Sequence, residues 1–172
     1  MVQGRVLYES KSFEAARQAF LEATSHAEAA GDEMHLTHIE GDVGMCWLAQ
    51  GERDEARRCL ERATERARRQ RQPALEASWL VELGKIAEAE ARYDDAEKLA
   101  RAALRIARPR EHRLTVFRAE WLRHRLAVRQ RPNAATGQRL ELLREMFEHL
   151  EDHEGIEEIR EFKNTVLRAG DL

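Results

Sequence analysis

Apolar residues recur along the whole chain at the three- and four-residue spacing that is typical of amphipathic helices. The last segment shows the pattern most clearly. One face of it carries Ile156, Ile159, Phe162, Val166 and Leu167, and the other carries mostly Glu157, Glu158, Glu161 and Arg168. The pattern predicts an all-α chain. We expect helices over residues 2–10, 13–30, 33–50, 53–70, 73–91, 93–108, 111–130, 134–151 and 153–168.

Turn and capping residues separate these predicted helices. Gly31 ends one helix, and Asp32 can cap the N-terminus of the next. Pro73 suits the first turn of a helix, whereas Pro109 must break one because it lacks a backbone N–H donor. The amphipathic last helix is expected to cap the end of the array.

Small residues repeat every 40 positions, which predicts a repeat architecture. The aligned series are Gly4, Gly44 and Gly84; Ala16, Ala56 and Ala96; and Ala23, Ala63 and Ala103. Two antiparallel helices can cross closely only where small side chains meet, and larger apolar residues then fill the space to the next pair. Each pair leaves an apolar face open, so the pairs are expected to stack into a solenoid.

The spacing within one repeat resembles the tetratricopeptide repeat (TPR). A glycine is followed by an alanine, a large apolar residue and a second alanine, which here are Gly4, Ala16, Phe20 and Ala23. The usual TPR spacing is about 34 residues, and the 40-residue spacing is similar to longer bacterial variants. The resemblance implies a right-handed α-solenoid of antiparallel helix pairs, a TPR-like superhelix with a C-terminal capping helix.

The resemblance implies a single TPR-like domain over residues 1–172. The units are expected at about 1–31, 32–71, 72–109 and 110–151, followed by a cap helix at 152–170. The fourth unit departs from the pattern, with His124 at the glycine position and Thr136 at the first alanine, while Leu140 and Leu143 hold the later positions. The first helix looks short beside its counterparts. Either the first unit is naturally short, or the chain is a module of a longer protein, which we favour.

Composition narrows the class of protein. Of 172 residues, 42% are hydrophobic, 35% charged and 6% aromatic, which disfavours an all-β fold and disorder. No apolar run is long enough for a membrane span, and no secretion signal opens the chain. We therefore expect a cytoplasmic protein, and the excess of arginine over lysine suggests a bacterial one. Cys46 and Cys59 are expected to be small buried thiols; a disulfide is conceivable but not indicated.

Charge is segregated along the chain. Residues 1–52 carry a net charge of −6, residues 53–131 carry +8, and residues 132–172 carry −5. The basic middle could guide an acidic partner, or its arginines could form an ordinary solvated face with neighbouring glutamates, which we favour. Nucleic acid is disfavoured as a partner because no helix-turn-helix or stacking motif is present.

Nothing in the sequence indicates catalysis. His35 and His38, and His149 and His153, are spaced for one helix face, but neither pair has a third strong metal ligand nearby. No nucleophile signature and no phosphate-binding glycine loop are found. The prediction is a non-enzymatic protein with no cofactor and no metal site, and with these histidines at the surface.

The TPR resemblance implies that the first helix of each pair lines a concave groove. The candidate groove residues are Arg5, Tyr8, His38, Asp42, Met45, Glu82, Lys85, Arg118 and Arg125. The carboxylate clamp of chaperone adaptors is not expected, since Arg5 alone has the required charge. Lys85, Arg118 and Arg125 are expected to point into solvent. Trp47, Trp79 and Trp121, one in each of three units, are expected to serve packing rather than binding.

These observations predict a protein- or peptide-binding scaffold that uses its concave groove. The alternative is a sensor or regulatory TPR segment of a larger bacterial transcriptional regulator. The expected partner is a protein or peptide with its own charge pattern, not a membrane, and homo-oligomers could form through the terminal repeats. If the convex ridge at Arg66, Arg68 and Arg69 carried the binding instead, a nucleic acid or acidic surface would become the favoured partner.

Overall fold

The computed structural model describes residues 1–130 and 135–168, apart from the side chains of residues 130, 135–137, 154 and 165–168. All regular elements within these residues are helices. They are α1 (Val2–Glu9), α2 (Phe13–Ala30), α3 (Glu33–Ala49), α4 (Arg53–Arg69), α5 (Pro73–Ala89), α6 (Tyr93–Ala107), a short 3₁₀ turn η1 (Arg108–Arg110), α7 (Arg113–Gln130), α8 (Ala135–His149) and α9 (His153–Arg168). The predicted all-α fold is confirmed, and the helix ends lie within about two residues of those expected.

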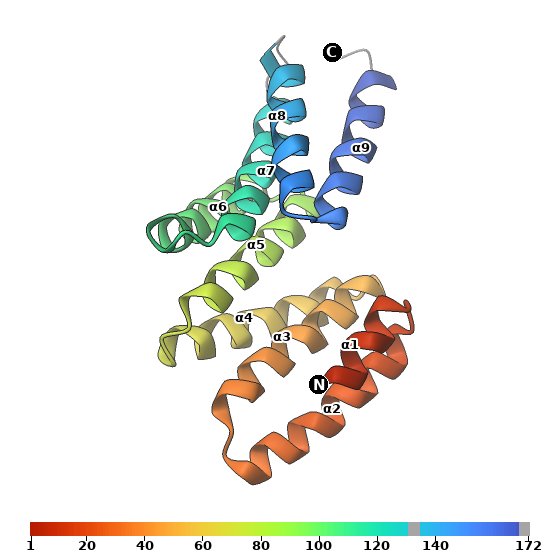
Figure 1. Ribbon diagram of the computed structural model, residues 1–172, viewed down its shortest axis with the longest axis vertical. Coiled ribbons are helices and arrows are strands. Elements are labelled where there is room, and N and C mark those ends of the chain that lie inside the picture. The colour runs from red at the N-terminus through yellow and green to blue at the C-terminus, as the bar shows by residue number, and fades with distance from the viewer. Residues whose placement is uncertain (131–134, 169–172) are drawn as a thin grey trace.

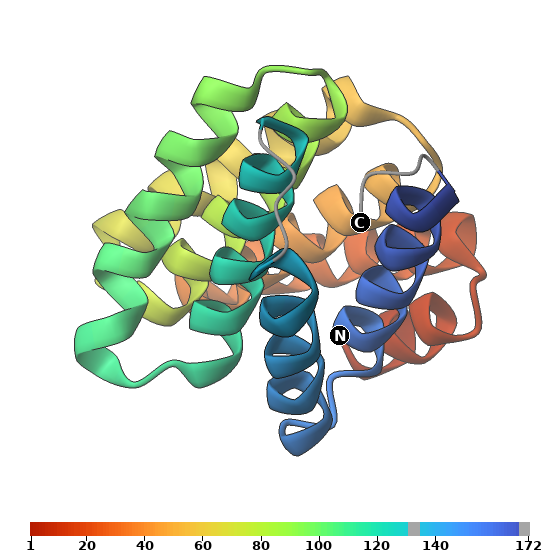
Figure 2. The ribbon, with the colours of Figure 1, turned by 90° about the horizontal axis from the view of Figure 1, so that it is seen from above.

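The helices form antiparallel pairs that follow one another in a solenoid (Figure 1). Helices α1 to α4 form one end, α5 crosses the middle, and α6 to α9 form the other end. Seen from above, α9 lies on the same side of the molecule as α1, so the array turns back over its own beginning (Figure 2). We call the side of the array on which α9 contacts α5 and α7 the concave side.

Glycines stand where two helices touch, which explains the 40-residue repeat. A Cβ atom on Gly4 would lie 2.6 Å from the Phe20 ring, and one on Gly44 would lie 3.0 Å from Cγ of Leu60. Each pair joins the first helix of one unit to the second helix of the same unit. The two residues are 16 positions apart in both units. Ala16, Ala56 and Ala96 are fully buried at the matching positions of the second helices.

The turns between helices share one backbone geometry. A residue in the left-handed region occurs at Lys11, Gly31, Gly51, Arg71, Ala91, Glu111 and Glu151. Successive positions are 20 residues apart. The interval between Glu111 and Glu151 is 40 residues, because residue 131 lies outside the described residues. The residue that follows each of them leads into the next helix, and at Asp32 its side chain accepts a hydrogen bond from the backbone N–H of His35, as the predicted N-cap requires.

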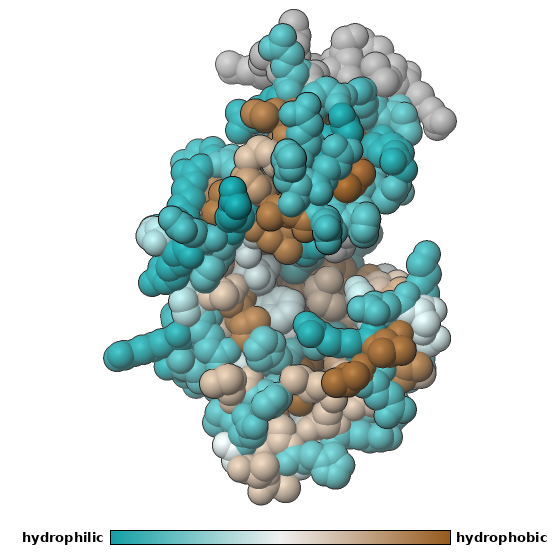
Figure 3. All heavy atoms as spheres, viewed as in Figure 1, coloured by the Kyte–Doolittle hydropathy of each residue, from teal (hydrophilic) through white to brown (hydrophobic). Residues whose placement is uncertain are grey.

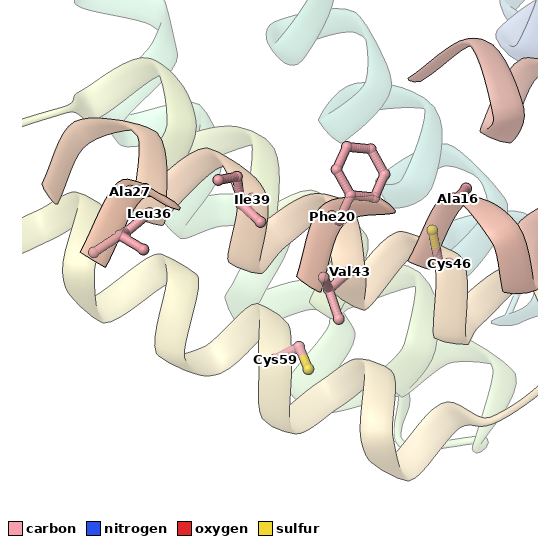
Figure 4. Close-up of a cluster of buried hydrophobic side chains, with 8 residues drawn as sticks. All are labelled: Ala16, Phe20, Ala27, Leu36, Ile39, Val43, Cys46 and Cys59. Carbon is pink, nitrogen blue, oxygen red and sulfur yellow. The ribbon is translucent and has the colours of Figure 1, made fainter. Parts of the chain in front are cut away.

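Apolar clusters run from one end of the solenoid to the other. Figure 4 shows the first, in which α2 contributes Phe20, α3 contributes Ile39 and Cys46, and α4 contributes Cys59. Both cysteines are free and buried, as expected. Burial raises the pKa of the Cys46 thiol to about 11, and Asp42 adds to the effect. The thiol is therefore protonated and unreactive at neutral pH.

The three tryptophans differ in burial. Trp79 and Trp121 are buried, as expected for residues that serve packing. Trp47 is only partly buried, and the guanidinium of Arg17 lies 4.2 Å from its ring centroid. None of the helices in the described residues is both long and apolar enough to cross a membrane.

The degenerate fourth unit keeps its core. His124 is buried where the other units carry glycine, and burial lowers its pKa to about 4, so it is neutral at physiological pH. Leu140, Leu143 and Phe147 of α8 form a cluster with Trp121 and with Ile159 of α9. The predicted positions Thr136, Val166, Leu167 and Arg168 lie outside the residues whose side chains are described. The described part of α9 covers this cluster, as a capping helix should.

Candidate ligand groove

The predicted groove residues fall into two groups at opposite ends of the concave side. The first group surrounds a hollow of about 420 Å³ between α1, α2 and α3, which we call the N-terminal hollow. It is lined by Arg5, Tyr8, Glu9, Phe20, Asp42 and Met45. The hydropathy surface is indented between α1 and α9 (Figure 3). The sequence thus identified four of the six residues that line the hollow.

Asp42 is the electrostatic centre of the N-terminal hollow. Burial raises the pKa of its carboxyl to about 6, although the nearby charges of Arg5 and the terminal amine oppose the shift. His38 lies on the same side of α3, and burial together with the charge of Arg5 lowers its pKa. Arg5 and Asp42 both line the hollow, together with the exposed Glu9. At neutral pH, above its pKa of about 6, Asp42 is mostly ionised.

The second group of predicted residues is engaged by α9. We call this set of contacts the cap-helix network. Lys85 Nζ donates to Oε1 of Glu158 over 2.8 Å, while Trp121 Nε1 and Arg125 Nη1 donate to its Oε2 over 2.9 and 2.8 Å. Glu158 therefore accepts hydrogen bonds from three side chains on two helices. Such charge-assisted bonds are stronger than neutral ones.

A second carboxylate anchors the first turn of α9. Arg118 of α7 donates to both oxygens of Asp152, from Nε over 2.9 Å and from Nη2 over 2.8 Å. Burial alone would raise the pKa of Asp152, but its hydrogen bonds to Arg118 outweigh burial and hold the pKa below its usual range. The same balance applies to Glu158, where the charges of Lys85 and Arg125 overcome burial. Both carboxylates are ionised at neutral pH.

Two glutamates of α5 complete the charge balance of this half of the groove. Glu82 is buried and lies 3.4 Å from Lys85, and Glu88 lies 2.7 Å from Arg125. The more exposed Arg129 also reaches Glu88, at 3.5 Å. In this half of the groove, cations of α5 and α7 thus contact Glu82 and Glu88 of α5, Glu158 of α9, and Asp152, which immediately precedes α9.

The prediction that Lys85, Arg118 and Arg125 point into solvent is wrong. Their side chains are only 15, 26 and 13% exposed. The reason is that α9 lies against the concave side of α5 and α7 and places its two carboxylates on these cations. The lysine and both arginines lie in the groove, but in this structure they bind a segment of the same chain.

Sequence reasoning missed Glu158 by placing it on the outward face of the last helix. It lies at the edge of the apolar face, four positions before Phe162, whose ring meets that of Trp121 edge-on with centroids 5.3 Å apart. A helical wheel places residues 158 and 162 within about 40° of each other. This proximity to an apolar position could have indicated that Glu158 faces the rest of the molecule and not solvent.

The basic ridge on α4 is paired with glutamates, as the solvated-face interpretation predicts. Arg66 contacts Glu33 and Glu40, and Arg68 contacts Glu65 and Glu76. Arg69 also contacts Glu65, which neutralises much of this ridge locally. The pairs with Glu65 lie within α4, and those with Glu33, Glu40 and Glu76 join α4 to neighbouring helices. Because the arginines are largely open to solvent, each pair contributes little on its own.

Histidines lie mostly at the surface. His149 and His153 are exposed, as predicted, and His35 is exposed and bonded to Asp32. Within the described residues, no three His, Cys, Asp or Glu side chains are grouped so as to hold a metal ion.

In fold, the chain is similar to solved structures of Rap proteins. One is the crystal structure of a Rap protein complexed with Competence and Sporulation Factor, with a TM-score of 0.67, 16% sequence identity and coverage of 94% of this chain and 50% of that one. The apo form of RapI matches with a TM-score of 0.65, 15% identity and coverage of 94% and 64%. The chain thus spans between half and two thirds of their lengths. No family model matches the chain, and no curated protein matches it by sequence. The likeness identifies the fold as a TPR-like helical solenoid.

Proposed function

We propose that the protein is a non-enzymatic scaffold that binds an extended segment of a partner protein, or a peptide, in the N-terminal hollow. The observation that carries the proposal is Asp42, a half-buried carboxylate in an open hollow. A carboxylate that has lost much of its hydration gains most from a cation that replaces the missing water. Tyr8, Phe20 and Met45 supply the apolar wall that the stem of a lysine or arginine would contact.

The hollow favours a ligand with charges of both signs. Arg5 stands beside Asp42, so a purely cationic ligand would meet repulsion, and a ligand that also carries a carboxylate would meet both groups. The likeness to a Rap protein that was solved with Competence and Sporulation Factor supports a binding role for this fold. In this proposal the protein works in the bacterial cytoplasm.

The alternative is that the chain is the sensor segment of a larger bacterial transcriptional regulator. It would use the same hollow, and ligand binding would alter an attached output domain. The likeness to Rap proteins solved in complexed and apo forms supports this alternative. A reporter that responds to ligand only when the neighbouring domain is present would favour this alternative.

The proposal is tested by selecting peptides from a random display library on the immobilised protein and measuring their affinity by calorimetry. Selected peptides should carry a lysine or arginine, and Asp42→Asn should weaken them at least about tenfold. Because the Asp42 pKa is about 6, affinity should rise between about pH 5 and pH 7. The matched controls are Arg66→Glu and Arg69→Glu on the convex ridge. If these abolish binding and Asp42→Asn does not, the site lies on the ridge.

Self-association through the terminal repeats is a second element of the proposal. Hydrophobic residues gather on the surface at α1 (Figure 3). Val2 is 80% exposed and Val6 58%, and Leu21 of α2 is also exposed. We expect light scattering over a range of protein concentrations to show that the original chain associates. A variant that carries both Val2→Ser and Val6→Ser should not associate.

A further inference from the structure

We propose that the cations of α5 and α7 form a binding site for an acidic amphipathic helix of a partner protein, and that α9 occupies this site in cis. Glu158 is held as a ligand would be, by one ammonium, one guanidinium and one indole N–H. These three donors come from two helices and converge on one carboxylate. The site lies apart from the N-terminal hollow and does not depend on the function proposed for it.

Charge complementarity defines the sign of the partner. Besides Glu158 and Asp152, Lys85 contacts Glu82, and Arg125 and Arg129 contact Glu88. The carboxylate of Asp152 is held by Arg118. Displacing α9 removes the Glu158 and Asp152 carboxylates from Lys85, Arg118 and Arg125, whose side chains are only partly exposed. Taking anions away from partly buried cations is unfavourable, so a competitor must bring carboxylates of its own.

The apolar contacts of α9 define the shape of the partner. One position after Glu158, Ile159 is buried against α8, and four positions after it Phe162 packs edge-on against Trp121. Asp152, at the start of the helix, holds Arg118. A carboxylate followed at one and four positions by apolar residues is the pattern of a helix that lies in a groove.

A protein helix fits this site better than a nucleic acid. The glutamates Glu82 and Glu88 remain in the groove and would repel a continuous polyphosphate. The cluster around Ile159, which α9 now covers, also needs an apolar partner. A helix with a carboxylate at one defined position, followed by apolar residues one and four positions later, satisfies both requirements.

Occupation in cis would make the site weak until α9 is displaced. The apparent affinity of a competitor falls in proportion to the fraction of molecules whose site is open. Weakening the hold on α9 should therefore strengthen binding of a competing helix, whereas weakening the site itself should abolish it. These opposite signs separate an occupied binding site from a purely structural ion pair.

The test uses the full chain and a fluorescent synthetic peptide with the sequence of residues 150–168 as the probe. Fluorescence anisotropy should show that Glu158→Gln in the chain raises affinity for the probe at least about tenfold, because the substitution weakens three hydrogen bonds and one charge-assisted bond alone is worth about that factor. The matched control is Glu157→Gln, one position away, where the side chain is exposed and pairs with Arg160 on its own helix. A triple variant that combines Glu158→Gln with Lys85→Gln and Arg125→Gln should lose this gain in affinity for the probe.

A second measurement does not depend on the folding of a variant. Hydrogen exchange on the original chain should show that saturating probe exposes the backbone amides of α9 while those of α5 and α7 stay protected, and a probe carrying Glu158→Gln should do so about tenfold less effectively. Equal affinity of the Glu157→Gln and Glu158→Gln chains, or no exposure of α9 at saturation, would overturn the proposal. If the Glu158→Gln chain dimerises without probe, the partner assignment fails and the occupant is α9 of a second copy.

Discussion

Lys85 on α5 donates a 2.8 Å hydrogen bond to Glu158 on α9, although 73 positions separate the two residues. The contact ties the third helix pair to the last helix across the concave side of the solenoid. The position of α9 therefore depends on buried charges as well as on its apolar stripe, and it should respond to pH.

We expect acid to release α9 before it unfolds the N-terminal repeats. The folded-state pKa values of Glu158 and Asp152 lie below their usual range, so the stabilisation they provide is complete above their ordinary pKa and disappears as pH falls through the folded values. Below about pH 4, hydrogen exchange of α9 should accelerate while α3 and α4 stay protected. In the Glu158→Gln variant, exchange should already be faster at pH 7 and depend less on pH. Simultaneous loss of all helices would contradict this order.

Deleting residues 153–172 should make the chain associate. The deletion uncovers Phe147, Leu140 and Leu143 of α8, together with Trp121, and the burial lost with the Ile156, Ile159 and Phe162 side chains is worth on the order of several kcal/mol. Light scattering should report dimers or larger species, and the melting temperature should fall. Replacing the exposed Glu157 and Arg160 of α9 by alanine is the control and should leave both unchanged. A monomeric, equally stable truncation would show that α9 is not a cap.

The local part of the fold could be read from the sequence. Helix ends follow from residues close together in the chain, such as the Asp32 cap, and the close helix crossings follow from glycines spaced 40 apart. Four residues of the N-terminal hollow were also predicted, because the groove-facing positions of a single helix repeat regularly. Such features depend on contacts within one repeat or between adjacent ones.

The cap-helix network could not be predicted in the same way. It depends on how far the solenoid turns between α5 and α9, and small angles at each helix pair add up over that distance. Residue patterns within one helix do not contain those angles. The sequence therefore identified Lys85, Arg118 and Arg125 as groove residues but could not identify Glu158 and Asp152 as the groups they bind.

Placing a leucine at either side of the second helix crossing should destabilise the fold. A Cβ on Gly44 would already lie 3.0 Å from Leu60 and 3.2 Å from Cys59, and Ala56 is fully buried. We expect Gly44→Leu and Ala56→Leu each to lower the free energy of unfolding by about 1–3 kcal/mol, measured by urea denaturation. Glu61→Leu on the exposed face of α4 is the control and should change it by less than about 0.5 kcal/mol. If all three variants unfold alike, the repeat register is wrong.

Ala91→Gly should stabilise the protein by about 1 kcal/mol. Ala91 has a φ of 58° at the turn after α5, a conformation that is unfavourable for a residue with a Cβ atom. The homologous turn of the preceding unit has Gly51 there, with a φ of 86°. Ala89→Gly, two positions earlier at the last residue of α5, is the matched control and should destabilise instead, because its backbone is helical. Equal shifts in thermal melting for both variants would show that the left-handed turn is not strained.

Asp42→Asn should raise the stability of the fold at neutral pH and remove the charged group that we propose for ligand binding. Burial raises the folded-state pKa of Asp42 to about 6, above the unfolded value, so the folded protein binds this proton more tightly than the unfolded chain does. Stability from this group is complete below about pH 4 and is lost as pH rises to about 6. Asparagine removes the buried charge, so denaturation should show a gain of about 1–3 kcal/mol at pH 7 and none at pH 4.

Glu9→Gln is the control for this variant, because Glu9 lines the same hollow but is exposed. It should change stability little at either pH. A gain for Asp42→Asn that is equal at pH 4 and pH 7 would mean that the carboxylate is not desolvated. A carboxylate that lowers stability at neutral pH and is needed for ligand affinity is typical of a binding site, where fold stability and function conflict. Measuring both properties on the Asp42→Asn protein therefore separates a binding residue from an incidental buried charge, for which only stability would change.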